Sequence, residues 1–394
     1  MLTVFKNVRV ITPVQIMDAM VVVDGARILG VHQHLDLPQG AAVIDGAGRY
    51  LSPGFVDIHV HGGGGFSVMS GSAQDVCGMA AAHGLFGTTS LVPTTLAAPI
   101  ARLCDAIDGV REAAAICKSA NILGIHLEGP FLAPSQRGAQ SPDSILVPSE
   151  HDYIPLLERW DKLLMMGAAP EVPGALMLGR ALAKRGVVAS VAHSDASYEQ
   201  VQAAMEQGYS DVTHIYSGCS TVTRKDGYRT AGVVEAGLAL DGLTVQMIGD
   251  LRHLPVSLLR LIYQCKGADK ISLITDGLEC SASALCEGTV YTQENGVETI
   301  YEDGVMKLMN RQAFAGSVAT CNVLVRNLYR EAGISLCDAV RMASLTPATV
   351  VGFGHCKGRI ASGYDADLLL YGEDIVPALV MVGGCIIHSA LSPQ

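Results

Sequence analysis

The stretch PGFVDIHVHG, residues 53–62, marks the point at which the character of this chain changes. Before it, residues 4–52 consist of short β-rich runs separated by the turn pairs Asp24-Gly25 and Asp45-Gly46, with no helical period. After it, and as far as residue 350, short apolar strands alternate with polar or glycine-rich loops and with helical stretches of about 12 to 18 residues. Such alternation predicts parallel strands that are joined by crossover helices.

Eight strands are expected in this region, which is the number that closes a (β/α)₈ barrel. They are Val56–Val60, Thr88–Val92, Ile122–Leu127, Leu163–Ala169, Val187–Ala192, Asp211–Ile215, Thr244–Ile248 and Ile271–Ile274. The competing topology is a long doubly wound sheet, but no Gly-x-Gly-x-x-Gly follows the first strand. We therefore predict an α/β fold with a TIM-type barrel.

The two ends of the chain are expected to form a second, smaller unit. Residues 358–388 again have the composition typical of β-strands, and the simplest arrangement pairs them with the N-terminal strands. The predicted organisation is a discontinuous β-sandwich domain, residues 1–52 and 357–394, beside a barrel domain of residues 53–356. The turn pairs Asn295-Gly296 and Asp303-Gly304 predict β-hairpins inserted after the eighth strand, at about residues 288–311.

Composition excludes several classes of protein. The chain has 394 residues, of which 49% are hydrophobic and 16% charged, so it is not disordered. A net charge of −11 argues against a nucleic-acid partner. The longest apolar run, residues 375–391, is interrupted by Pro377 and Gly383-Gly384, so no transmembrane helix is predicted. The first six residues lack the zones of a signal peptide, and the 11 cysteines form no Cys-x-x-Cys pair, so we expect a cytoplasmic protein with reduced thiols.

Candidate metal ligands stand at the ends of five predicted strands. His59 and His61 are two residues apart, so the pleat points both imidazoles to one side of the first strand. The other candidates are Glu128, His193, His214 and Asp276. Imidazole and carboxylate are donors for zinc, with iron or manganese as alternatives. The pattern predicts metal-assisted hydrolysis, in which Asp276 takes a proton from water and later delivers one to the leaving group. His126, two residues before Glu128, is interpreted as an interior residue.

These segments resemble the amidohydrolase superfamily, and within it the N-acetylglucosamine-6-phosphate deacetylases. The resemblance is carried by residues 53–62, by HLEGP at 126–130, by the strand-end residues His193, His214 and Asp276, and by AGS at 315–317 and GRIASGYDADL at 358–368. It implies that Glu128, His193 and His214 hold the main metal ion, that His59 and His61 hold a second, and that Asp276 is the acid/base carboxylate. It also implies a homodimer.

Other segments resemble the substrate-binding residues of that family. DLRH at 250–253 supplies His253, and RTAG at 229–232 supplies Arg229 as a phosphate clamp. A guanidinium suits phosphate because it offers a planar fork of donors. Two positions depart from the family pattern: Gln140 stands where a histidine is usual, and IYSGC at 215–219 replaces Leu-Phe-Asn-Ala-Met. We expect Gln140, Ser217 and Gly218 to bind substrate in an altered recognition shell.

The function that the resemblance implies is a zinc-type hydrolase, with one or two ions, that removes acetate from an N-acetylhexosamine. N-acetylglucosamine 6-phosphate or a related amino sugar is the expected substrate, in amino-sugar catabolism. Two alternatives stay open. One is another hydrolase of the superfamily that opens a cyclic amide or deaminates a heterocycle, and the other is a sugar-phosphate-binding paralogue without turnover.

Overall fold

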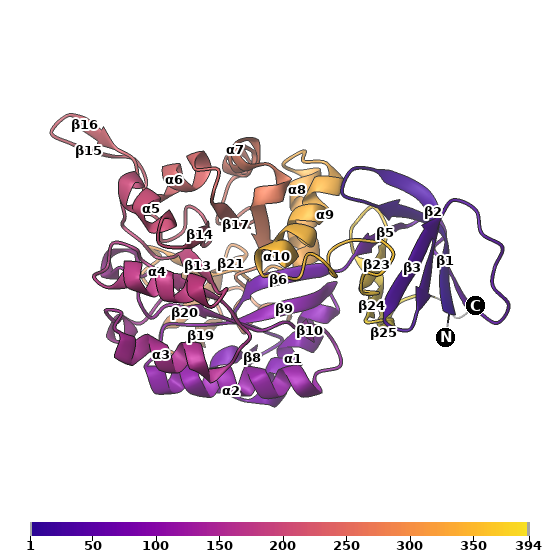
Figure 1. Ribbon diagram of the computed structural model, residues 1–394, viewed down its shortest axis with the longest axis horizontal. Helices are drawn as coiled ribbons and strands as arrows, with labels where there is room; N and C mark the ends of the chain where they lie inside the picture. Colours follow the sequence, from indigo (N-terminus) through magenta and orange to yellow (C-terminus); the bar gives the residue numbers. More distant parts are fainter. Residues whose placement is uncertain (1, 392–394) are drawn as a thin grey trace.

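The central part of the chain forms a nearly closed barrel of eight parallel strands (Figure 1). The computed structural model describes residues 2–391, and of Lys225 only the backbone. The barrel strands are β6 (Phe55–Val60), β9 (Thr88–Thr95), β11 (Ile125–Glu128), β12 (Leu163–Ala168), β13 (Val188–Val191), β14 (Tyr209–Val212), β17 (Thr244–Ile248) and β18 (Ile271–Ile274). They pair in this order, with the short β10 (Asn121–Ile122) beside β9. The predicted barrel is thus confirmed.

A helix follows each strand, as a parallel barrel requires. The helices are α1 (Ala73–Gly84), α2 (Ile100–Ile116), α3 (Glu150–Arg159), α4 (Ala175–Lys184), α5 (Tyr198–Met205), α6 (Val233–Ala239), α7 (Val256–Lys266) and α8 (Cys321–Arg330), and then α9 (Leu336–Met342) and α10 (Leu345–Val350). Ser72 caps α1, and Ser197 with Gln200 forms a capping box on α5. Within residues 2–391, no helix has the length and apolarity needed to cross a membrane.

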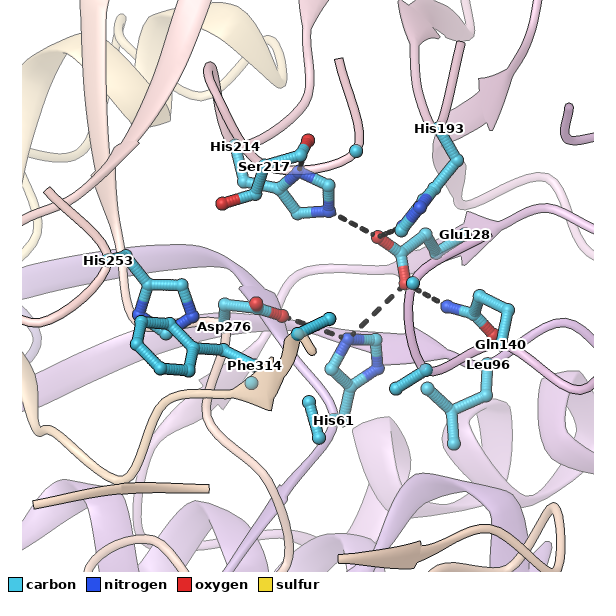
Figure 2. Close-up of a pocket in the computed structure, with 16 residues that line it drawn as sticks. His61, Leu96, Glu128, Gln140, His193, His214, Ser217, His253, Asp276 and Phe314 are labelled. Carbon is cyan, nitrogen blue, oxygen red and sulfur yellow. Dashed lines mark hydrogen bonds and ion pairs between the residues drawn. The ribbon is translucent and has the colours of Figure 1, made fainter. Parts of the chain in front are cut away.

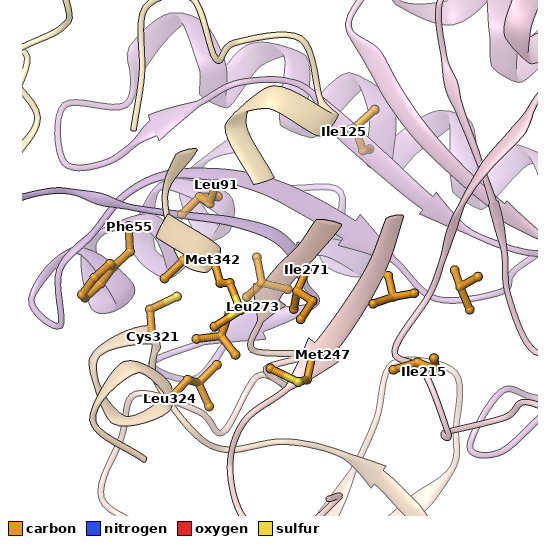
Figure 3. Close-up of a cluster of buried hydrophobic side chains, with 14 of the residues drawn as sticks. Phe55, Leu91, Ile125, Ile215, Met247, Ile271, Leu273, Cys321, Leu324 and Met342 are labelled. Carbon is orange, nitrogen blue, oxygen red and sulfur yellow. The ribbon is translucent and has the colours of Figure 1, made fainter. Parts of the chain in front are cut away.

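The barrel core has two faces, because side chains alternate along each strand. Outward residues such as Phe55, Met247 and Leu273 pack against helices, among them Leu324 of α8 and Met342 of α9 (Figure 3). Inward residues form a separate apolar layer that α10 closes; it comprises Val56, Ile58, Val92, Leu123, Met165, Ile248, Ile274, Ala348 and Val351. The polar residues of the interior therefore lie toward the opposite end, where the strands finish.

The barrel closes between its first and last strands by backbone hydrogen bonds. The amide of Asp276 donates to the carbonyl of His59 at 2.9 Å, and the amide of His61 donates to the carbonyl of Gly277 at 2.8 Å. The hydrogen bonds that close the barrel thus also bring His59 and His61 next to Asp276, where the site is predicted.

Strands from both ends of the chain share one eight-stranded sheet. Its members are β1 (Leu2–Ile11), β2 (Ile16–Asp24), β3 (Arg27–His32), β4 (Ala42–Asp45), β5 (Tyr50–Pro53), β23 (Leu368–Tyr371), β24 (Pro377–Val382) and β25 (Cys385–Ser389). β23 pairs antiparallel with β5. The edge strand β3 also bonds to the segment before β23, through Ile28 N–H to the Tyr364 carbonyl at 2.9 Å, so the sheet bends over a single core. This is the small extra domain; its exact limits at residues 52 and 357 stay a prediction.

Three smaller hairpin units complete the fold. β19 (Val290–Thr292), β20 (Glu298–Glu302), β21 (Val305–Leu308) and β22 (Phe314–Gly316) form an antiparallel sheet after β18. Asp303 and Gly304 both have positive φ, 55° and 78°, as a tight hairpin turn requires. β7 (Gly62–Gly63) pairs with β8 (Phe66–Ser67), and β15 (Thr223–Lys225) pairs with β16 (Tyr228–Thr230) in a hairpin that projects from the barrel in Figure 1.

A buried ion pair of the extra domain lies where that domain meets the barrel. The ammonium of Lys357 lies 2.7 Å from Asp367 and 2.9 Å from Asp365, and Asp367 also accepts from Asn121 of β10. Burial opposes the charge on Lys357, but Asp367 outweighs it and raises the pKa of the lysine.

We expect Lys357→Met to lower the free energy of unfolding by about 3 kcal/mol, because it leaves a buried carboxylate without its cation. Denaturant titration measures this value. The control is Lys6→Met, which removes a half-exposed lysine of the same domain 3.6 Å from Asp45 and should cost less than about 1 kcal/mol. Equal effects of the two substitutions would contradict the prediction.

Candidate active site

The carboxyl ends of the barrel strands surround a cavity of about 170 Å³ (Figure 2). Enzymes with this fold carry their chemistry at this end of the barrel. His59 is fully buried and contacts His61, which lines the cavity, from the barrel interior. Nine of the eleven predicted site residues line the cavity: His61, Glu128, Gln140, His193, His214, Ser217, Gly218, His253 and Asp276.

Glu128, the last residue of β11, lies at the centre of the site. Its Oε1 is 2.8 Å from Nε2 of His214, 3.2 Å from Nε2 of His193 and 3.4 Å from Nε2 of His59. Its Oε2 accepts a hydrogen bond of 2.6 Å from the amide of Gln140. Three imidazoles, one from β6 and two from the loops that follow β13 and β14, therefore converge on one carboxylate oxygen.

His59 and His61 point to the same side of β6, as their spacing predicts. Their Nε2 atoms are 3.3 Å apart, and these atoms lie 3.4 and 3.1 Å from Oδ1 of Asp276. Two sets of three donors have all their atoms within 4.8 Å of one another: His59, Glu128 and His214, and His59, His61 and Asp276. The first set contains His59 where the sequence led us to expect His193, which contacts the same oxygen of Glu128.

All four imidazoles present Nε2 to the centre because a carbonyl oxygen faces each Nδ1. The partners of Nδ1 are Gln246 Oε1 for His59 at 2.8 Å, and the backbone carbonyls of Thr94 for His61 at 3.1 Å, Gln136 for His193 at 2.8 Å and Ser217 for His214 at 3.0 Å. A carbonyl only accepts, so in the neutral ring Nδ1 carries the proton and Nε2 keeps its lone pair. Converging imidazole lone pairs and carboxylates are the donors that a divalent metal such as zinc requires, so the residues fit a metal site.

The electrostatics of the cluster favour positive charge at its centre. Burial opposes a charged His59, but the charge and hydrogen bond of Glu128, followed by the charge of Asp276, raise the pKa of this imidazole to about 9. Burial also opposes a charged Glu128, yet the neighbouring His59 and His193 hold the pKa of Glu128 well below its usual range. The carboxylates thus stay ionised and attract a cation.

Three site residues have a left-handed backbone although none is glycine. The φ angles are 45° at His193, 23° at His214 and 50° at Asp276. Such conformations cost about 1 to 3 kcal/mol each and persist only where the surroundings hold them. The carbonyl of Asp276 accepts from Ser317 N–H at 2.9 Å and that of His193 accepts from Ala133 N–H at 2.9 Å, so neighbouring loops fix these turns.

The predicted substrate-binding residues divide into two groups. His253 lines the cavity; its Nδ1 bonds to Asp250 at 2.7 Å, and its ring lies edge-on to Phe314, with centroids 5.1 Å apart. Gly218 also lines it, with a φ of 56°, and a Cβ there would stand 2.7 Å from Nδ1 of His193. Only glycine therefore allows His193 its position.

Gln140 lines the cavity as predicted, but its amide bonds within the protein, whereas Arg229 lies away from the cavity. The Gln140 side chain donates to Glu128 and accepts from the amide of Ala97 at 2.8 Å, so both ends of its amide are engaged within the protein. We interpret Gln140 as a residue that orients Glu128. Arg229 is exposed on β16 of the projecting hairpin, where it donates to the Gly227 carbonyl.

Two apolar lining residues, Leu96 and Phe314, escaped the sequence analysis. Leu96 directly follows β9, and Phe314 comes from β22 of the inserted sheet. The predicted insertion could have indicated Phe314 from the sequence. A segment that follows the eighth strand begins at the end of the barrel that carries the site.

Comparison with known proteins agrees with this geometry. The family model described as "Amidohydrolase family" matches residues 50–387. The N-acetylglucosamine-6-phosphate deacetylase of Lysinibacillus sphaericus is 30% identical over 89% of this chain and 88% of its own length. An N-acetylgalactosamine-6-phosphate deacetylase of Escherichia coli O157:H7 is 31% identical over 84% of this chain and 86% of its own length.

Solved structures give the same result. The crystal structure of the N-acetylglucosamine-6-phosphate deacetylase from Pasteurella multocida is 27% identical with a TM-score of 0.92, and the match covers 98% of this chain and 99% of that one. A mutant of the Mycobacterium smegmatis enzyme in complex with N-acetyl-D-glucosamine-6-phosphate is 28% identical, with a TM-score of 0.89 and 99% of both chains covered. This chain therefore belongs to the amidohydrolase family, in its N-acetylglucosamine-6-phosphate deacetylase branch.

Proposed function

We propose that this protein is a metal-dependent deacetylase that hydrolyses the N-acetyl group of an N-acetylhexosamine 6-phosphate. The observation that carries the proposal is the convergence of four imidazoles on Glu128 and Asp276 inside the cavity, in a chain of this branch. Named relatives act on both the gluco and the galacto sugar, so the proposal includes both configurations.

We assign the metal ligands on the donor atoms. Glu128, His193 and His214 would hold the main ion, and His59 and His61 would contribute to a second, next to Asp276. Zinc suits this nitrogen and oxygen set, with ferrous iron or manganese as alternatives. When bound, the metal supplies a Lewis acid that polarises the amide carbonyl and lowers the pKa of water.

The reaction needs one group that moves protons, and Asp276 lies in place for it. Its Oδ1 faces the imidazoles while the residue lines the cavity. Asp276 accepts a proton as the water oxygen bonds to the carbonyl carbon, and returns it to the amide nitrogen as the C–N bond breaks. The products are acetate and the free amino sugar. His253, which Asp250 orients, contacts the sugar beside the reacting group.

The phosphate group requires a cation from outside this cavity. Among the described residues that line it, the only basic side chains are imidazoles. Arg229 lies on the projecting hairpin instead, and the neighbouring Tyr228 is 81% exposed. We propose that the protein is a homodimer in which this hairpin brings Arg229 to the partner's cavity. We also propose a cytoplasmic location, which the 11 free thiols favour.

The test of the function is an acetate-release assay on metal-loaded protein with N-acetylglucosamine, N-acetylgalactosamine and their 6-phosphates. We expect acetate from at least one 6-phosphate and loss of activity with a chelator. Release of ammonia from heterocycles, opening of cyclic amides, or binding of the sugar phosphates without acetate would contradict the proposal.

Arg229→Ala is expected to raise KM for the phosphorylated substrate about 10- to 100-fold and to leave kcat nearly unchanged, because a charge-assisted contact is lost in ground state and transition state alike. Steady-state kinetics on the matching unphosphorylated sugar serve as the control. Equal changes in KM for the two sugars would remove Arg229 from the phosphate site.

A further inference from the structure

A line of buried polar side chains runs through the barrel interior to His59. Gln246, in the middle of β17, accepts from Nδ1 of His59 at 2.8 Å and donates from its amide nitrogen to Oδ2 of Asp211 at 2.8 Å. Asp211 belongs to β14 and also accepts from Ser190 at 2.8 Å and from Thr244 at 2.6 Å. His59, Gln246 and Asp211 are all fully buried.

The direction of these hydrogen bonds is fixed by Asp211. An amide turned the other way would place its oxygen against the Asp211 carboxyl group, whose two oxygens already accept from Ser190 and Thr244. The amide nitrogen of Gln246 must therefore face Asp211, and the amide oxygen must face His59. Because that oxygen only accepts, the proton of the neutral ring resides on Nδ1, and the lone pair on Nε2 points to Glu128 and Asp276.

His59 differs in this respect from the other three imidazoles of the site. His61, His193 and His214 are oriented by backbone carbonyls, which no substitution removes. His59 alone among the four depends on a side chain, that of Gln246. Gln246 in turn bonds to Asp211 of β14, a strand that does not pair with β6.

We propose that Gln246 and Asp211 are positioning residues that hold His59 as a metal ligand, and that they thereby set the affinity of the donor set His59, His61 and Asp276 for its ion. The inference rests on the proposed metal-dependent function. Hydrogen-bond partners that orient a ligating histidine typically contribute about 10- to 100-fold to metal affinity.

The first test is Gln246→Met, which keeps a similar length and removes both hydrogen bonds. We expect zinc affinity, measured by competition with a chelator in the absence of substrate, to fall about 10- to 100-fold for one ion while the other ion is retained. The matched control is Ser272→Ala. Ser272 lies opposite Gln246 on β18, is fully buried, and its hydroxyl has no partner among the described residues, so its loss should leave both affinities unchanged.

The second test is a rescue. Gln246→Glu alone sets two carboxylates against each other and should weaken zinc binding as Gln246→Met does. Combined with Asp211→Asn, it restores one carboxylate and one amide in exchanged places, with an acceptor still facing His59. We expect zinc affinity to return to within about threefold of the parent protein, since the coupling of neighbouring substitutions is not additive.

A spectroscopic measurement separates orientation from stability. In the zinc-loaded protein, the Nδ1 proton of His59 should give a slowly exchanging imidazole signal, which Gln246→Met abolishes and Ser272→Ala preserves. Unchanged zinc affinity in Gln246→Met would overturn the inference, whether or not the His59 signal persists. Because no substrate is used, failure of the deacetylase proposal would appear in the acetate assay and not here.

Discussion

Asp276→Asn is expected to lower kcat by about 10²- to 10⁴-fold while the protein stays folded and keeps its main metal ion. Asparagine has the same shape, and it tolerates the left-handed backbone at this position, where φ is 50°. What it cannot do is accept a proton from water and return it to the leaving nitrogen. The expected pattern is therefore a loss of turnover without a loss of metal from Glu128, His193 and His214.

Steady-state kinetics and metal analysis on the same preparation check this result. The control is Glu279→Gln, which neutralises a carboxylate three residues farther along the same loop. Glu279 lines a smaller cavity on the other side of His61 and Leu96, so kcat should change little. If Asp276→Asn kept most of the rate, the assignment of the proton carrier would be wrong.

Glu128→Ala is expected to abolish activity by removing the metal itself. This carboxylate is 2% exposed and contacts three imidazoles through a single oxygen. Its loss takes away both a ligand and the negative charge that stabilises a cation in a buried place. The fall in metal affinity should be larger than the loss of about 10- to 100-fold that is typical when the substituted residue only orients a ligand.

The measurement is metal content after gel filtration, followed by titration with zinc. Glu128→Gln is the informative companion, because it keeps the length of the side chain and loses the charge, and we expect it to fall between Glu128→Ala and the parent protein. Stoichiometric zinc in Glu128→Ala at parental affinity would show that the site does not assemble around this residue.

The architecture followed from periodicity because buried parallel strands leave a clear pattern in sequence. Thr244–Ile248 and Ile271–Ile274 were predicted with the bounds that the structure has, since each is a short apolar run between loops. The Asp303-Gly304 hairpin was equally readable, because a tight turn with positive φ at both residues strongly restricts composition.

Contacts between distant residues were harder to predict. Gln246 is a polar residue in the middle of a predicted buried strand, and Asp211 begins another; each was visible as an exception to the apolar pattern, but sequence alone does not show that they face each other. The position of Arg229 depends on how far a hairpin projects, and Gln140 bonds to Glu128 through a loop. Such contacts depend on how distant segments meet in the folded barrel, and a local sequence pattern does not encode that.

The left-handed turns at His193, His214 and Asp276 bear on the evolutionary history of this chain. Glycine would relax each of these three backbones, but it would also delete a side chain that we propose as a nitrogen ligand or as the proton carrier. Two histidines and an aspartate in such conformations are therefore what selection for these side chains, and not for backbone stability, would leave.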